Sequence, residues 1–400
     1  MKPKAVLAFS GGLDTSYCAL WLREQGYDVH TVLVRTDNDT DQIQAIEQRA
    51  RDLGVTHHVT LDARQELFDD HLRYLIFANA LRGDVYPLCV SAERVVQAKR
   101  CAQYAAECGA AAIAHGSTGA GNDQIRFDTA FRIFAPEAVL LTPIRKHALS
   151  REQETAYLAD HGIHIPNKTT KYSINRGLWG ATIGGVETHR GDTELPDDAY
   201  ILTRSPADRP QSPEEVRIGF EHGVPRSLNG EPMDPIRLIA SLDERAGLHG
   251  IGRGVHIGDT ILGIKGRVAF EAPAAVVLIP AHRELEKLIL SRQQLFWKRT
   301  LGDLYGSFLH EARFFDPLMR DVEAFLESSQ RCVTGEVRIR LFQGQAAVLG
   351  ATSPCSLLDS GIARYGEDTS CWNGDEAAAF AKIYGLQDWL IARVQKTGGS

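Results

Sequence analysis

The chain has 400 residues, of which 44% are hydrophobic and 24% charged, and its formal net charge at pH 7 is −7. This composition predicts a globular protein of two or three domains, and the acidic balance argues against nucleic-acid binding, which needs clustered Lys and Arg. The longest apolar run, residues 272–281, is too short to span a bilayer, so we expect neither a nucleic-acid nor a membrane partner.

The first 165 residues alternate between short apolar runs and amphipathic stretches. The apolar runs predict buried strands at residues 5–9, 29–34, 57–61 and 111–114. Apolar residues at helical spacing, together with glycine stops and a Ser150–Gln153 capping box, predict helices over residues 13–25, 43–53, 91–108 and 150–162. Such alternation predicts an α/β fold, a doubly wound parallel sheet with helices on both faces.

The pattern changes from about residue 166. Strand-like segments at residues 215–221, 261–271 and 333–349 predict a second domain of the α+β class. Residues 376–395 carry the apolar stripe of a C-terminal helical tail that packs or oligomerises. We expect domain boundaries that divide the chain into residues 1–165, 166–372 and 373–400.

The cysteines and the N-terminus bear on the cellular compartment. Seven scattered cysteines without a C-x-x-C pair are typical of a reducing environment. Residues 1–4 lead into a short strand rather than the apolar core of a signal peptide. These features predict a cytoplasmic protein.

A glycine-rich loop joins the first predicted strand to the first helix, where Gly11 and Gly12 let the backbone approach a ligand closely. Ser10, Thr15 and Ser16 add hydroxyl donors at the positive end of the helix dipole, which predicts a bound polyphosphate. The loop has neither the lysine of a Walker cradle nor the spacing of a dinucleotide fingerprint. The alternative is an ordinary glycine turn.

Residues 8–16 resemble the S-G-G-x-D-[ST]-S loop of the N-type ATP pyrophosphatases. The resemblance implies that ATP is cleaved between its α and β phosphates and that AMP is placed on a substrate oxygen. It also implies a catalytic role for Asp14 and an ATP site formed by Ala8, Phe9, Ser10, Gly11, Gly12, Leu13, Asp14, Thr15 and Ser16.

A second exceptional segment, residues 115–127, follows the strand at 111–114. Three glycines free its backbone, and Thr118, Asn122, Asp123 and Arg126 supply donors, a carboxylate and a guanidinium, which suit a zwitterionic ligand. The alternative is a polar, turn-rich connection. Because both loops follow predicted parallel strands, we expect them to face one cleft.

Residues 115–127 also resemble the signature H-G-x-T-G-x-G-N-D-Q-[VI]-R-F of the argininosuccinate synthase family, with Ala120 at a position where that family usually has lysine. The resemblance covers essentially the whole chain. Further motifs follow in the same order, at residues 86–94, 172–179, 249–253, 281–286 and 333–337.

The resemblance implies that the ureido oxygen of citrulline attacks the α-phosphate of ATP and that the amine of aspartate then displaces AMP. It places Val34, Arg94 and Gly116 near ATP, with Mg²⁺ carried by the nucleotide and no protein metal ligands. Asp123 and Arg126 join Asp14 as catalytic residues. Aspartate is bound by Thr118, Asn122 and Asp123, and citrulline by Tyr86, Ser91, Asn122, Arg126, Ser173 and Thr182. The family is usually tetrameric, so we expect a homotetramer.

Several departures from the family cluster around the citrulline site. Gly258 stands where the family has a glutamate that helps to bind citrulline, and Phe270 stands where it has a tyrosine. Loss of a charge-assisted hydrogen bond costs about 1.5–3 kcal/mol, so either the site is rearranged or the ureido substrate differs. Two competing functions are that of an ATP pyrophosphatase that modifies tRNA and that of an inactive nucleotide-binding paralogue.

Overall fold

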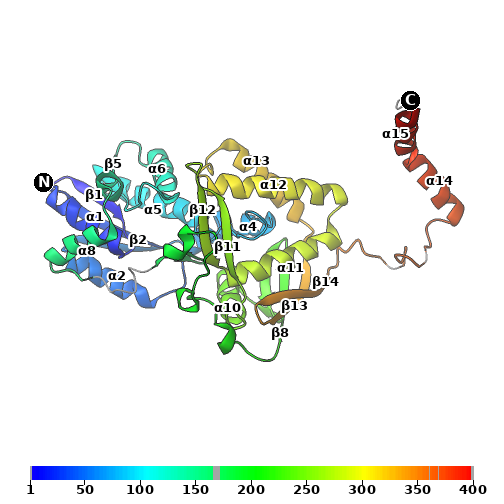
Figure 1. Ribbon diagram of the computed structural model, residues 1–400, viewed down its shortest axis with the longest axis horizontal. Coiled ribbons are helices and arrows are strands. Elements are labelled where there is room, and N and C mark those ends of the chain that lie inside the picture. The colour runs from blue at the N-terminus through cyan, green and yellow to red at the C-terminus, as the bar shows by residue number, and fades with distance from the viewer. Residues whose placement is uncertain (1, 165–171, 360, 368, 398–400) are drawn as a thin grey trace. The chain divides into compact units, whose positions relative to one another are not determined.

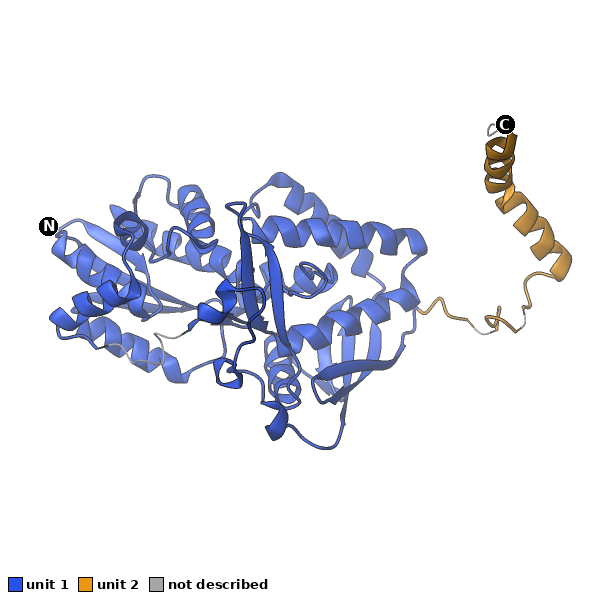
Figure 2. Cartoon of the chain, in the orientation of Figure 1, with its two compact units in different colours: residues 1–355 blue, residues 356–400 orange. Residues whose placement is uncertain are grey.

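The computed structural model describes residues 2–164, 172–359, 361–367 and 369–397. The chain divides into two compact units, residues 1–355 and 356–400 (Figure 2). The domain boundaries expected after residues 165 and 372 stay predictions.

The first unit begins with a five-stranded parallel sheet (Figure 1). Its strand order is β3-β2-β1-β4-β5, from β1 (Lys4–Ala8), β2 (Asp28–Arg35), β3 (His57–Asp62), β4 (Ala112–Ala114) and β5 (Val139–Leu141). The main connecting helices are α1 (Leu13–Glu24), α2 (Asp41–Asp52), α5 (Ser91–Cys108), α6 (Asp123–Phe134), α7 (Pro143–His147) and α8 (Arg151–Asp160). Ala5 and Leu7 belong to one buried apolar cluster and Val6 to another, because alternate residues of a strand face opposite sides of the sheet. The predicted doubly wound α/β fold is confirmed.

Two antiparallel sheets and a set of helices follow in the same unit. One sheet has the order β10-β9-β8-β13-β14, from β8 (Glu214–Glu221), β9 (Val224–Leu228), β10 (Glu231–Pro232), β13 (Gly335–Phe342) and β14 (Gln345–Thr352). The other has the order β11-β12-β7-β6, from β6 (Ser173–Gly177), β7 (Gly180–Gly184), β11 (Arg253–Asp259) and β12 (Lys265–Glu271). The longer helices are α10 (Pro235–Leu248), α11 (Pro273–Ile289), α12 (Arg292–His310) and α13 (Pro317–Gln330). This arrangement confirms the predicted α+β class.

Several predicted elements differ in detail. The segment 333–349 is a hairpin that turns at Gln343 and Gly344, and the strand expected at 261–271 begins only at Lys265. The strand β5 was not predicted; unlike the equally short β4, which is fully buried, it has one exposed and two half-buried residues. The tail predicted at 376–395 consists of two helices, α14 (Gly374–Tyr384) and α15 (Leu386–Thr397).

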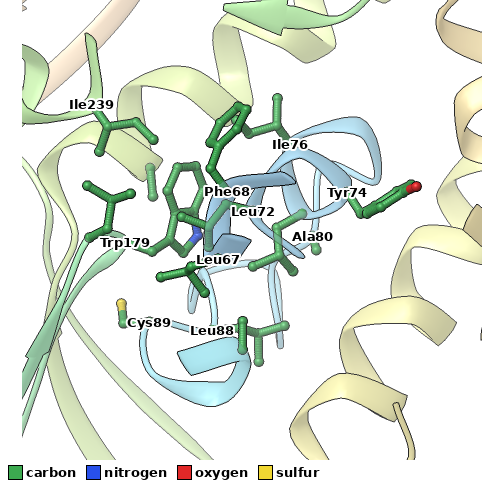
Figure 3. Packing of buried hydrophobic residues seen from close by; sticks show 14 of the residues in the cluster. Leu67, Phe68, Leu72, Tyr74, Ile76, Ala80, Leu88, Cys89, Trp179 and Ile239 are labelled. Carbon is green, nitrogen blue, oxygen red and sulfur yellow. The ribbon is translucent and has the colours of Figure 1, made fainter. Parts of the chain in front are cut away.

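A shared core ties the parallel sheet to the antiparallel sheets. Between them lie three short helices, α3 (Arg64–Leu67), the π-helical turn η1 (Phe68–Leu72) and α4 (Arg73–Phe77). Trp179, from the turn between β6 and β7, packs among side chains of these helices and Ile239 of α10 (Figure 3). Its Nε1 donates a hydrogen bond to the carbonyl oxygen of Pro87 at 2.9 Å. This bond anchors the loop that carries Tyr86. Among the described residues, no helix combines the length and the apolar character needed to cross a membrane.

Candidate functional site

Two glycine-bearing loops meet at the carboxyl ends of β1 and β4, which are neighbours in the parallel sheet. A Cβ atom on Gly116 would lie 3.3 Å from the carbonyl carbon of Asp14 and from the backbone nitrogen of Thr15, so a side chain at residue 116 would push the loops apart. Both loops line one cleft of about 860 Å³. The prediction that they face a common cleft is therefore correct.

The loop after β1 has an open helix end. Gly11 has φ +70°, a conformation that disfavours other residues, and Gly12 caps α1 without any side-chain hydrogen bond to the first turn. Ser10 Oγ lies 3.2 Å from Thr15 Oγ1, and the backbone N–H of Gly12 points to Ser10 Oγ at 3.4 Å. Free N–H groups beside two hydroxyls at a helix N-terminus form a site for phosphate oxygens.

An acidic pair lies at the base of this loop. Asp14 faces Arg151 of α8 at 3.9 Å, and Glu154 of the same helix is buried beside it. Burial and then the charge of Asp14 raise the pKa of Glu154 to about 8. Glu154 therefore carries a proton at neutral pH, which keeps two negative charges from meeting under the loop. Glu154 was not among the predicted site residues.

The second loop and α6 present a carboxylate held by two arginines. Asp123 accepts hydrogen bonds from Arg94 Nε at 2.9 Å and from Arg126 Nη1 at 2.8 Å. Burial by itself raises the pKa of Asp123, but the two guanidinium charges outweigh it and bring the pKa to about 2. Arg94 also donates to Asn175 Oδ1 at 2.7 Å, which links α5 to β6. Asp123 is thus ionised and held by two arginines of the parallel-sheet part, one of which also contacts the antiparallel sheet.

His310, at the end of α12, was missed by the sequence analysis although it lines the cleft. Its carbonyl oxygen accepts hydrogen bonds from Arg126 Nε at 3.1 Å and Nη2 at 2.8 Å, and its Nδ1 lies 3.1 Å from Arg126 Nη2. Burial and the charge of Arg126 lower the pKa of His310 to about 2, so the imidazole is neutral. An isolated histidine at a helix end, far along the chain from residues 115–127, carries no local signal of this role.

The far side of the cleft is built around Tyr86, a buried side chain. The ring of His256 in β11 stacks on it, with centroids 5.7 Å apart and planes at 16°, and Phe270 packs against it at 5.2 Å. Ser173 of β6 and Thr182 of β7 line the cleft beside these residues. All four strands of one antiparallel sheet therefore contribute to this side of the cleft, with Gly266, Arg267 and Val268 from β12.

Most of the predicted site residues belong to the described lining of the cleft, and four of them do not. Gly11, Ser16, Ser91 and Phe270 do not line it: Ser16 Oγ is buried without a hydrogen-bond partner, and Ser91 packs against His310 at 3.5 Å. The predicted residues that line the cleft are Ala8, Phe9, Ser10, Gly12, Leu13, Asp14, Thr15, Val34, Tyr86, Arg94, Gly116, Thr118, Asn122, Asp123, Arg126, Ser173, Thr182 and Gly258.

Outside the cleft, one group of side chains has the spacing of a metal site. Ligand atoms of Asp28, His30 and His57 lie within 4.8 Å of one another where β2 and β3 begin, the opposite end of these strands from the cleft. His57 contacts the ring of His30 at 4.4 Å, whereas His58 bonds to Thr31 at 2.8 Å. The adjacent histidines therefore have different neighbours, as expected on a strand.

The parallel sheet carries a phosphate-type loop after its first strand, and the antiparallel part of the chain adds polar side chains to the same cleft. These features define the class of nucleotide-binding α/β enzymes. The comparisons with known proteins narrow this class. Residues 4–164 match the arginosuccinate synthase N-terminal HUP domain, and residues 172–391 match the arginosuccinate synthase C-terminal domain. The chain belongs to the argininosuccinate synthase family, and it is an enzyme, a carbon–nitrogen ligase with a nucleotide substrate.

Full-length relatives support this assignment. The argininosuccinate synthase of Methanocaldococcus jannaschii is 41% identical over 397 residues, which cover 99% of this chain and 100% of the relative. The enzyme of the same name from Symbiobacterium thermophilum is 40% identical over 400 residues and 99% of each chain. That of Rubrobacter xylanophilus is 38% identical over 384 residues, covering 96% of this chain and 93% of the relative.

Proposed function

We propose that this enzyme joins citrulline to aspartate with ATP, releasing AMP and pyrophosphate and forming argininosuccinate. The observation that carries the proposal is the contact of Gly116 with the Asp14–Thr15 backbone. It brings the phosphate loop next to the Arg94–Asp123–Arg126 cluster, so an α-phosphate, an acceptor oxygen and an amine fit one cleft. The role of the protein in this chemistry is to position the reactants and neutralise their charge.

In the first step, the ureido oxygen of citrulline attacks the α-phosphate and pyrophosphate leaves. The backbone N–H groups at the start of α1 and the Ser10 and Thr15 hydroxyls are placed to hold phosphate oxygens. Mg²⁺ bound with the nucleotide would supply positive charge to the departing pyrophosphate. Val34, near the end of β2, lines the cleft, and the family resemblance assigns its backbone to the adenine.

In the second step, the ammonium of aspartate loses a proton to solvent, the resulting amine attacks the ureido carbon, and AMP leaves with the ureido oxygen. The ionised carboxylate of Asp123 suits the ammonium of aspartate, with Thr118 and Asn122 on the same loop as donors. Asn122 also accepts a hydrogen bond from the Ile261 backbone N–H at 2.9 Å, which joins this loop to the β11–β12 hairpin. Tyr86, Ser173 and Thr182 form the citrulline side.

An isotope experiment tests both steps. With ATP, Mg²⁺, aspartate and citrulline labelled with ¹⁸O in the ureido group, the AMP formed should gain two mass units, because the bond to phosphorus is made by the ureido oxygen. Pyrophosphate should form without aspartate only to the level of one adenylate per site. AMP without the label would show that water or another group is the acceptor, and the proposal would fail.

The apolar tail bears on the oligomeric state of the enzyme, and the cysteines bear on its cellular compartment. The described residues of α14 and α15 include none that is buried, and their exposed apolar side chains suit a homotetramer that covers them. All seven cysteines are free thiols, which suits the cytoplasm.

A further inference from the structure

The charged groups at one end of the cleft bear on which acceptor the enzyme can bind. This end, called here the β11 end, is formed by Tyr86, Ser173, Thr182, His256 and Gly258. Along β11, His256 and Gly258 are half-buried, whereas Val255, Ile257 and Asp259 are exposed, as strand alternation requires. His256 and Gly258 are thus the residues that β11 turns toward the acceptor.

The imidazole of His256 covers Gly258. A Cβ atom on Gly258 would lie 2.5 Å from His256 Nε2, so a side chain at residue 258 and this histidine conformation exclude each other. His256 Nε2 is buried without a hydrogen-bond partner, while the ring is held flat against Tyr86. A buried imidazole nitrogen without a partner is suited to a polar group of a ligand.

The charge of Arg82, which lies 3.8 Å from Glu311, acts on this imidazole. Arg82 donates to the carbonyl oxygen of Asp259 at 3.2 Å, and burial followed by the charge of Arg82 lowers the pKa of His256. Of the acids in the described lining nearest to this end, Asp123 is the proposed partner of the aspartate ammonium and already pairs with Arg94 and Arg126, and Asp259 pairs with Lys265 at 2.7 Å.

The other acids of the described lining, Asp14, Asp37 and Asp39, follow β1 and β2 on the nucleotide side. Of these, Asp39 pairs with Arg176 at 3.1 Å. At the β11 end, the described residues therefore leave no unpaired carboxylate for an ammonium group. A neutral amide is the better match, because its carbonyl oxygen accepts from an imidazole N–H and it brings no positive charge near Arg82.

We propose that the cleft also accepts ureido acids whose α-amine is acylated, with a specificity constant at least equal to that for citrulline. The inference rests on the proposed function and extends its substrate class. The bonds made and broken are those of the citrulline reaction, so the product is argininosuccinate with an acylated α-amine, together with AMP and pyrophosphate. His256 and Gly258 act as specificity residues.

The test compares kcat/KM for pyrophosphate release with citrulline and with Nα-acetylcitrulline, at saturating ATP, Mg²⁺ and aspartate. An equal or higher value for Nα-acetylcitrulline is the expected result. A lower value overturns the inference while leaving the proposed function intact. Absence of pyrophosphate with both acceptors overturns the proposed function, and with it the inference.

A variant pair tests the residues themselves. The double variant His256→Ala with Gly258→Glu removes the imidazole and supplies a carboxylate, so it should shift the preference toward citrulline by at least tenfold. Ile257→Glu is the matched control, because it places the same charge on the exposed face of the same strand, and its preference should equal that of the parent. An equal shift in both variants would show a general charge effect and overturn the role of His256 and Gly258. If the double variant does not fold, the proposal is decided by the ratio of kcat/KM for Nα-acetylcitrulline to kcat/KM for citrulline in the parent enzyme.

Discussion

Arg126 and His310 lie 184 residues apart in the sequence and meet in the cleft, where Arg126 Nη2 donates to the His310 carbonyl at 2.8 Å and approaches Nδ1 at 3.1 Å. The contact joins α6 of the parallel-sheet lobe to the end of α12. Arg126 in turn pairs with Asp123, so the histidine orients a guanidinium that holds the central carboxylate. The contact between α6 and α12 therefore also fixes the position of the charges in the cleft.

Replacing His310 should slow the reaction by loosening Arg126. His310→Ala removes the side-chain contact but keeps the carbonyl, so we expect kcat/KM to fall about tenfold, as for the loss of one hydrogen bond to a charged group. His310→Gln supplies an amide oxygen and should recover part of the loss. Because the pKa of His310 is held to about 2, His310 itself should add no step to the pH–rate profile between pH 6 and 9. A step that disappears in His310→Gln would contradict this assignment.

Asp123→Ala should abolish the second half-reaction more completely than the first. Loss of the carboxylate leaves Arg94 and Arg126 facing each other without a counter-charge and removes the proposed partner of the aspartate ammonium. We expect argininosuccinate formation to fall by at least 10²-fold, while some citrulline-dependent adenylate still forms. Asp123→Asn keeps the shape and tests the charge alone. Equal activity of both half-reactions in Asp123→Ala would place aspartate elsewhere.

Gly11→Ala should raise the KM for ATP. Gly11 has φ +70°, and a Cβ atom there would lie 2.9 Å from Ile46 Cγ1, so the loop must shift. Gly26→Ala is the matched control, because Gly26 has φ +86° and open space around it, away from the described lining of the cleft. Both variants should lose about 1 kcal/mol of folding free energy from backbone strain, but only Gly11→Ala should weaken ATP binding. Denaturant unfolding and initial rates at varied ATP distinguish the two effects.

Local patterns were enough to predict the parallel sheet and both loops of the cleft. Strand alternation and glycine positions are encoded within a few neighbouring residues, and parallel strands put their carboxyl ends at one edge. This logic predicted that Gly116 and the loop after β1 would face the same cleft. The tertiary packing then decided which loop atoms are exposed, which is why Ser16 points into the core instead.

The residues that the sequence did not reveal reach the site through long-range packing. His310 comes from a helix end, and Asn175 reaches Arg94 across 81 positions. Single polar residues in such elements look like ordinary surface residues in the sequence. Their role depends on the Trp179 contact with Pro87 and on the pairing of β12 with β7, which no local pattern specifies.

Acidification should lower the free energy of unfolding, in part because of His71. This side chain is 2% exposed and packs on Phe314, and burial, followed by the charges of Arg320 and Lys99, lowers its pKa to about 3. Between pH 6.5 and 3 the unfolded chain binds a proton that the folded chain does not, so stability present above pH 6.5 is lost as pH falls.

The slope expected from His71 is about 1.4 kcal/mol per pH unit, or about 2 kcal/mol between pH 6.5 and 5. His71→Leu should remove this part of the slope in denaturant unfolding at the two pH values. His189→Gln, at an exposed histidine, should leave the slope unchanged. An unchanged slope in His71→Leu would show that the folded protein protonates this residue as readily as the unfolded chain.

The tail helices should control assembly. Trp389, Leu390 and Val394 of α15 are 56%, 45% and 67% exposed, which leaves a large apolar surface on a helix of 12 residues. Such a surface is stabilised when another copy of the chain buries it, at about 1.5–3 kcal/mol for each large side chain. Trp389→Glu with Leu390→Glu should therefore raise the dissociation constant of the assembly at least 100-fold, seen as smaller species in sedimentation velocity at micromolar protein. Gln387→Glu adds a charge to the same helix without removing apolar area and should sediment as the parent does. Either of two results would exclude α15 as the contact: a parent chain that already sediments as a monomer, or a double variant that sediments as the parent does. Measuring kcat at the same protein concentrations would show whether each cleft works alone.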